Sequence, residues 1–219
     1  MITFEKIKKD ERIKTYIAKA DESLIALGYT EHSFAHVTKV AECAGYILET
    51  LGYPDHYVDL VKIAGYMHDI GNLVNRVEHS QSGAVMAFRI LENMGMDPAD
   101  VAEIVTAIGN HDEGTAYPVN SAAAALFLAD KSDVRRSRVR NRDVHSFDIH
   151  DRVNYSVVSS ALTIDESKTN ISLALKIDTE YSSVTDYFEI FLDRMILCRK
   201  AAEKLGLRFR LVINDVQLM

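Results

Sequence analysis

The chain has 219 residues, of which 47% are hydrophobic and 26% are charged, and its net charge at pH 7 is -7. These values are ordinary for a globular protein with one sizeable core, and they exclude a largely disordered chain. The acidic balance argues against a nucleic-acid coat protein, because such a protein needs a basic excess to neutralise phosphates.

No stretch approaches the roughly 20 apolar residues that a membrane span requires, and the N-terminal segment lacks the long apolar region of a signal peptide. The two cysteines, Cys43 and Cys198, lie inside apolar helical patterns, as reduced thiols in a core do. We therefore expect a soluble cytoplasmic protein without a structural disulfide and without a membrane partner.

Up to about residue 140, apolar residues recur at helical spacing. The predicted helices are separated by stop signals at Gly28, Gly52 to Pro54, Gly71 and Gly95 to Pro98, and Tyr117 with Pro118 precedes the alanine-rich helix. This pattern predicts an all-helical, bundle-like domain with short connections.

After His145 the pattern changes. The predicted elements are half-buried strands at 153–158 and 171–177, a turn-rich link at 166–170, an amphipathic helix at 185–205 and a final strand at 209–213. The sequence therefore predicts a mainly α protein with a helical domain over 1–150 and a small α+β domain over 151–219.

Residue types that bind metals occur on three predicted helices. His68 and Asp69 end an apolar run that Gly71 closes, and the adjacent imidazole and carboxylate form a compact chelate for a divalent metal. His36 lies upstream and Asp130 downstream. A single buried histidine is more often a core residue, but the complete ordered set favours a metal site.

Two further histidines extend this set. His79 stands just before a predicted helix, and His111 stands at the end of the next one. With them the chain offers enough donors for two ions, and Asp69 is the natural bridge because a carboxylate has two oxygens. Alternatively, His79 caps a helix and His111 complements a helix dipole, which leaves one ion. His32 is either a solvated residue or an additional partner of the site.

The ordered motif His, His-Asp, Asp resembles that of the HD-domain superfamily of metal-dependent phosphohydrolases, over about residues 30–135. The resemblance implies an HD-domain helical bundle that binds one or two divalent ions, drawn from Mn, Fe, Co, Ni, Zn and Mg. The metal ligands that it implies are His36, His68, Asp69, His79, His111 and Asp130.

The layout is also similar to the cyclic-diguanylate phosphodiesterase branch of that superfamily. This sequence departs from the branch in three places: Asn72 stands where the branch has lysine, Asp112 where it has a second histidine, and Ala116 where its Gly-Tyr-Pro signature has glycine. The branch is therefore a poor guide to the substrate, and the resemblance does not explain the C-terminal unit.

A basic segment follows Asp130. If the helix continues beyond it, Lys131, Arg135, Arg138 and Arg142 share one face. Because guanidinium groups bind phosphate oxygens, we predict that Lys131, Arg135 and Arg138 bind a phosphorylated substrate. The alternative is a solvated face that pairs with nearby aspartates.

These observations predict hydrolysis of a phosphate ester or anhydride, with a nucleotide as the expected substrate, by a metal-activated water. We expect Asp69 and Lys131 to be catalytic, with Asp112 and Glu113 as candidates for proton transfer. The alternatives are a di-iron oxygenase of the HD type and a nucleotide-sensing binding module. The expected partner is a small phosphorylated molecule rather than nucleic acid, and the C-terminal unit is a candidate surface for homo-oligomers.

Overall fold

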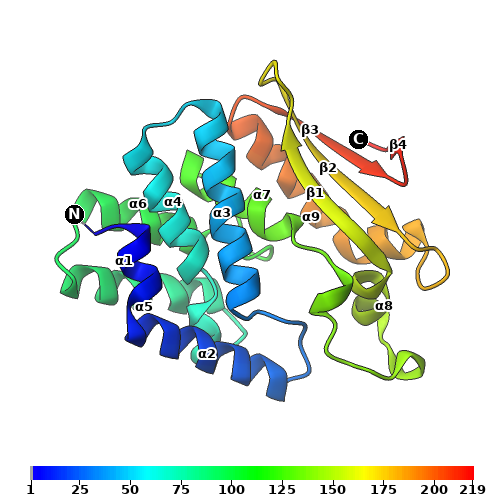
Figure 1. Cartoon of the computed structure of the whole chain (residues 1–219), viewed down its shortest axis with the longest axis horizontal. Coiled ribbons are helices and arrows are strands. Elements are labelled where there is room, and N and C mark those ends of the chain that lie inside the picture. The colour runs from blue at the N-terminus through cyan, green and yellow to red at the C-terminus, as the bar shows by residue number, and fades with distance from the viewer. Residues whose placement is uncertain (1) are drawn as a thin grey trace.

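The computed structural model describes residues 2–219 and places a helical part before a small α+β part (Figure 1). The helices are α1 (Phe4–Lys9), α2 (Glu11–Ala26), α3 (Phe34–Leu51), α4 (Asp55–Met67), α5 (His79–Asn93), α6 (Pro98–Gly109), α7 (Ser121–Ser132), α8 (Ile149–Ser156) and α9 (Val184–Lys204). The strands are β1 (Val157–Ile164), β2 (Asn170–Ile177), β3 (Arg208–Ile213) and β4 (Val216–Gln217). The prediction of a mainly α protein with a small C-terminal α+β unit is confirmed.

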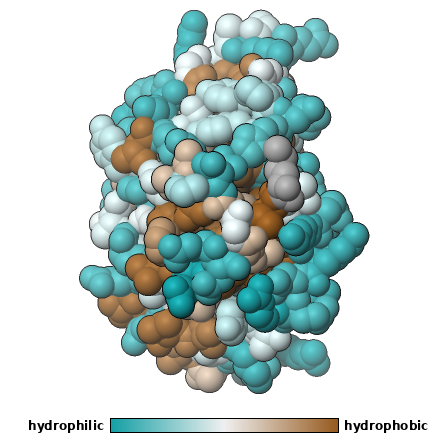
Figure 2. Space-filling view, turned by 90° about the vertical axis from the view of Figure 1, so that its left-hand side faces the viewer, coloured by the Kyte–Doolittle hydropathy of each residue, from teal (hydrophilic) through white to brown (hydrophobic). Residues whose placement is uncertain are grey.

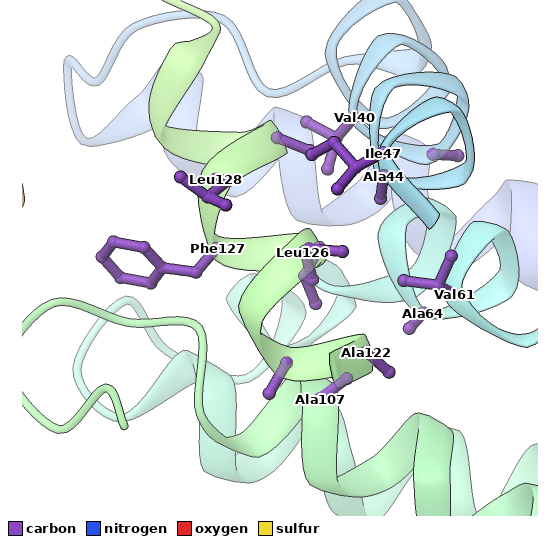
Figure 3. Packing of buried hydrophobic residues seen from close by; sticks show 14 of the residues in the cluster. Val40, Ala44, Ile47, Val61, Ala64, Ala107, Ala122, Leu126, Phe127 and Leu128 are labelled. Carbon is purple, nitrogen blue, oxygen red and sulfur yellow. The ribbon is translucent and has the colours of Figure 1, made fainter. Parts of the chain in front are cut away.

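Helix α7 is the central element of the helical part. Its four consecutive alanines, at 122 to 125, are all buried, and their small side chains let neighbouring helices approach closely. Ala122 and Leu126 point toward α3 and α4, where Ala44 and Ala64 face them, while Phe127 points to the opposite side (Figure 3). Helix α7 therefore contacts α3, α4, α6 and α9 at once, and it holds Asp130 in the interior.

The helix ends follow the local signals. Ser33 caps α3 by accepting a hydrogen bond from the backbone of Ala35, and Gly52 ends the same helix with a φ of 85°. Asp97 caps α6, and Pro98 occupies its first turn, where no backbone donor is lost.

Gly71 differs from its predicted role. Helix α4 ends at Met67, four residues earlier, and Gly71 lies in the short helical turn Ile70–Leu73. A Cβ atom at Gly71 would stand 1.9 Å from the carbonyl oxygen of His79 and 2.5 Å from the amide nitrogen of Gly83. Gly71 is therefore required by the close approach of α5 rather than by a helix end.

The C-terminal sheet has the order β1-β2-β3-β4, in which β2 and β3 run parallel and the other neighbours run antiparallel. The parallel pair requires a crossover, and α9 supplies it. Helix α9 contacts β3 and also α7, so it lies between the sheet and the helical part (Figure 1). Buried residues of both parts belong to one continuous core. The division near residue 150 stays a prediction.

One predicted strand is partly wrong. Residues 153–156 belong to α8, and the strand begins only at Val157. The Asp148 side chain caps α8 through the backbone of Asp151, which favours the helix over the alternating pattern. The other strands and the long helix lie where the sequence predicts them, and the two-residue β4 was not predicted.

None of the helices within residues 2–219 combines the length and the apolar character that a membrane crossing needs. Figure 2 looks onto the side of the molecule where α1, α5 and α6 lie, and hydrophobic residues there are interspersed with hydrophilic ones. On α5, Val85 and Phe88 are among the exposed apolar side chains.

Candidate metal centre

The structure brings the six predicted metal ligands together from five helices. His36 comes from the first turn of α3, His68 and Asp69 directly follow α4, and Asp130 belongs to α7. The remaining two are His79, the first residue of α5, and His111, which follows α6. The four histidines and Asp69 are buried, and the Asp130 side chain is 11% exposed.

A first group of donor atoms surrounds one point. His36 Nε2 lies 3.3 Å from Asp130 Oδ1 and 3.7 Å from Asp69 Oδ2. His68 Nε2 lies 3.1 Å from the same Asp69 oxygen and 3.8 Å from Asp130 Oδ1. Donor atoms that share one ion at about 2.1 Å are roughly 3.0 to 3.4 Å apart. These four atoms are therefore close to the spacing that one ion needs.

A second group uses the other oxygen of Asp69. His79 Nε2 lies 3.5 Å and His111 Nε2 lies 3.8 Å from Asp69 Oδ1, and the two nitrogens are 3.1 Å apart. Asp69 thus directs one oxygen at each group. This arrangement suits a carboxylate that bridges two ions.

Each histidine of the cluster is oriented by a hydrogen bond at Nδ1, the ring nitrogen opposite the inward-facing Nε2. Each Nδ1 atom lies within 3.0 Å of an acceptor: Asp133 Oδ2 for His36, and the backbone carbonyl oxygens of Gly65, Arg76 and Ile108 for His68, His79 and His111. A carbonyl oxygen can only accept, so Nδ1 carries a proton, and in the neutral ring Nε2 keeps its lone pair. Neutral imidazoles held in this tautomer are suited to metal binding.

Several inner atoms lack a protein partner. His36 Nε2, His68 Nε2 and Asp69 Oδ2 are buried, and none of them has a hydrogen-bond partner among residues 2–219. Buried polar atoms are normally paired because an unpaired one is costly. In the second group, His79 Nε2 and His111 Nε2 face each other across 3.1 Å, and Arg76 Nη1 lies 3.3 Å from His79 Nε2. A cation satisfies the three unpaired atoms of the first group together, so the residues present fit a metal ion.

The protonation states of His79, His111 and Asp69 agree with this fit. Burial lowers the pKa of His79 to about 4, and burial also lowers the pKa of His111. Burial opposes ionisation of Asp69, but His68 and His111 outweigh it and hold the pKa of Asp69 well below its usual range. The second pair of imidazoles is thus neutral and Asp69 is ionised at neutral pH, which are the forms that bind metals.

Asp133 holds His36 in place, a role that the sequence did not indicate. Its Oδ2 accepts the His36 Nδ1 proton at 2.8 Å, and its Oδ1 accepts from Lys39 at 2.7 Å and from Arg135 at 3.0 Å. Burial opposes ionisation of Asp133, but the bond from His36 and the charge of Arg138 keep its pKa well below its usual range. A charged carboxylate behind a histidine raises the basicity of that ligand.

We expect Asp133→Asn to weaken metal binding about tenfold to a hundredfold, because the neutral amide no longer supports His36 as a carboxylate does. Competition with a chelator of known affinity measures the effect. The control is Asp143→Asn, at an exposed helix cap where asparagine serves equally well. Metal affinity within twofold of the wild type would show that Asp133 serves only the fold.

The predicted basic face is wrong, because α7 ends at Ser132 and the chain turns away after it. Asp133 turns inward to His36, so the arginines beyond it do not continue one helix face. Arg135 forms ion pairs with Glu31 at 2.7 Å and with Asp133. Arg138 is buried and donates to the backbone oxygens of Glu31 and Asp133. The guanidinium donors of Arg135 and Arg138 are therefore largely used in hydrogen bonds and ion pairs within the protein.

Lys131 remains beside the cluster. Its Nζ lies 2.7 Å from Asp130 Oδ2 and 3.5 Å from Glu113 Oε1. Glu113 also accepts from Arg194 Nε at 2.7 Å, so this carboxylate joins two cations. Among the residues that the structure describes, Asp112 does not line the cavity beside the cluster.

A cavity of about 490 Å³ opens onto the cluster. Asp69, Asp130, Lys131 and Arg138 line it, whereas Arg135 does not. His32, which the sequence left as either solvated or an additional partner, lines the cavity. Other lining residues that the sequence did not indicate are Arg76, His150, Asp151, Asn154, Phe191 and Arg194. Arg76 could have been predicted from its position three residues before His79. The lining residues of α8 and α9 could not, because nothing in their local sequence indicates the site.

The family model of the HD domain matches residues 33–152, which is more than half of the chain. The chain belongs to the HD domain family of metal-dependent hydrolases, and its buried His and Asp cluster can hold a metal ion. The chain is also similar to uncharacterized protein MJ1020 of Methanocaldococcus jannaschii, at 25% identity over 210 residues. That match covers 85% of this chain and 79% of MJ1020, a larger share of this chain than the HD domain alone.

Proposed function

We propose that this protein is a metal-dependent phosphohydrolase that cleaves a phosphate ester or anhydride of a small molecule, with nucleotides as the first class to test. The observation that carries the proposal is the donor cluster opening into a cavity that Lys131, Arg76 and Arg138 also line. Cations beside a metal centre suit a phosphorylated ligand. The volume of about 490 Å³ lies within the range of small-molecule sites.

In this proposal His36, His68, Asp130 and one oxygen of Asp69 would hold a first ion. His79, His111 and the other oxygen of Asp69 would hold a second. A divalent cation bound here would lower the pKa of a water molecule toward neutrality, which would supply the nucleophile, and it would offset charge on the phosphoryl oxygens.

The surrounding residues position and stabilise the substrate. Lys131 is held by Asp130 and Glu113, so its charge is fixed near the cluster and opposes the negative charge that develops during phosphoryl transfer. Arg76 contacts Asn72 and His79 but forms no ion pair with a carboxylate among residues 2–219. Its remaining donors are available for a phosphate oxygen.

The test is a metal analysis of the purified protein, followed by assays of the metal-loaded protein on phosphomonoesters, nucleotides and cyclic dinucleotides. We expect hydrolysis of a subset of them, loss of activity with a chelator and recovery when the metal is restored. A metal-loaded protein that hydrolyses none of them contradicts the proposal. Iron content with an oxygen-dependent optical change would indicate the di-iron alternative.

We expect Lys131→Met to lower kcat/KM for phosphorylated substrates about tenfold to a hundredfold, because one charge-assisted contact with phosphate is lost. Metal content should stay unchanged. The control is Lys200→Met on the exposed side of α9. If kcat/KM of Lys131→Met stays within twofold of the wild type, Lys131 is not a phosphate contact and the metal centre is the main anchor.

A further inference from the structure

The C-terminal unit forms part of the cavity wall. Phe191 and Arg194 of α9 line the cavity together with Asp69 and Asp130. Helix α9 lies outside the residues that the HD domain model matches. A ligand in the cavity therefore meets side chains that the HD domain itself does not provide.

Arg194 is fixed in position from two sides. Its Nε donates to Glu113 Oε1 at 2.7 Å, and its guanidinium carbon lies 3.8 Å from the centre of the Phe191 ring. The side chain is 20% exposed. Among residues 2–219, neither terminal nitrogen of Arg194 has a hydrogen-bond partner. The guanidinium is thus fixed by Glu113 at Nε and by the Phe191 ring on one face. Its two terminal nitrogens keep their hydrogen-bond donors for another partner.

This arrangement differs from that of the other cations around the cavity. Arg138 uses its donors on backbone oxygens, and Lys131 is already paired with two carboxylates. Arg76 shares one terminal nitrogen between Asn72 and His79. Arg194 alone among these four combines fixation by a carboxylate and an aromatic ring with two terminal nitrogens that have no partner within residues 2–219.

Arg194 is also connected to the metal centre. Glu113 Oε1 accepts from Arg194 and lies 3.5 Å from Lys131 Nζ, which in turn pairs with Asp130 at 2.7 Å. A chain of three ion pairs therefore connects Arg194 to Asp130, a proposed metal ligand. A planar guanidinium with two free parallel donors matches two oxygens of one phosphate group. Because its position is set in advance, little conformational entropy is lost on binding.

We propose that Arg194 is a specificity-determining residue supplied by the C-terminal unit, and that its two terminal nitrogens bind two oxygens of a phosphate group on the substrate. The inference rests on the proposed function, because it assumes a phosphorylated ligand at the metal centre. The phosphate is either the one that is transferred or a second one further along the ligand, and two probes separate these cases.

The experiment titrates the metal-loaded protein with inorganic phosphate and with pyrophosphate by calorimetry. Arg194→Lys keeps the charge but loses the paired donors, and Arg194→Gln can still donate to Glu113 but loses the charge. The matched controls are Arg199→Lys and Arg199→Gln, because Arg199 is exposed on the same helix. Metal content and thermal unfolding are measured for each variant.

We expect both Arg194 variants to bind a probe about tenfold to a hundredfold more weakly than the wild type, with unchanged metal content. Weaker binding of both probes assigns Arg194 to the transferred phosphate, and weaker binding of pyrophosphate alone assigns it to a second phosphate. In assays on a hydrolysed substrate, the Arg194 variants should raise KM more than they lower kcat. The Arg199 variants should match the wild type.

Affinity within twofold of the wild type for both probes, in either folded and metal-loaded Arg194 variant, overturns the inference. If Arg194→Gln fails to fold, Arg194→Lys decides. Failure of the proposed function gives a different result: the wild type binds phosphate with the help of Arg194 but hydrolyses no phosphate ester. A wild type that binds neither probe contradicts the inference directly.

Discussion

Asp69→Ala should abolish the metal centre and the activity together. One carboxylate oxygen of Asp69 lies beside His36 and His68, and the other lies beside His79 and His111. Its removal leaves four imidazoles with Asp130 as the one carboxylate donor. We expect kcat/KM to fall at least about a thousandfold, because the source of the nucleophile is lost with the metal.

Metal analysis and kinetics on the same preparation test this result. His79→Ala is the informative comparison, because it disturbs the second group alone and should remove one ion while the other stays bound. Asp55→Ala, an exposed carboxylate at the start of α4, controls for the loss of an aspartate from that region. Full turnover with normal metal content in Asp69→Ala would rule out the proposed centre.

Gly71→Ala should cause the largest loss of stability among the glycine variants. The added methyl carbon would stand 1.9 Å from the backbone oxygen of His79 and 2.5 Å from the backbone nitrogen of Gly83, and neither atom can move without moving α5. We expect the free energy of unfolding to fall by about 3 kcal/mol. Since His79 begins α5, metal content in the second group should fall as well.

Chemical denaturation measures the change, with Gly109→Ala as the matched control. Gly109 ends α6, and a methyl group there would meet the side chain of Ala84 at 3.6 Å, an ordinary contact distance. Alanine is favoured over glycine in a helix, so this control should be neutral or gain up to about 1 kcal/mol. Equal stability of Gly71→Ala and the wild type would mean that α5 can shift without cost.

The structure also explains why two predictions from the sequence pattern, the basic helix face after Asp130 and the strand at 153–156, were wrong. The run of basic residues after Asp130 has helical spacing, but Asp133 is drawn inward by His36, Lys39 and Arg135, and the helix stops one residue before it. Residues 153–156 alternate like a strand, but a capped helix forms there because Asp148 satisfies its first turn. In both cases a polar contact outweighed a periodic pattern that is only a weak local preference.

By itself the sequence determined the helical class, most helix ends and the six donor residues of the cluster, because each depends on residue types or on short-range spacing along one element. The pairing of the two oxygens of Asp69 with separate histidine groups depended on how α3, α4, α5, α6 and α7 pack. Asp133 behind His36 and Arg194 beside Glu113 are 97 and 81 residues from their partners. Only the tertiary structure could decide such contacts, because no local pattern carries information about a partner so far along the chain.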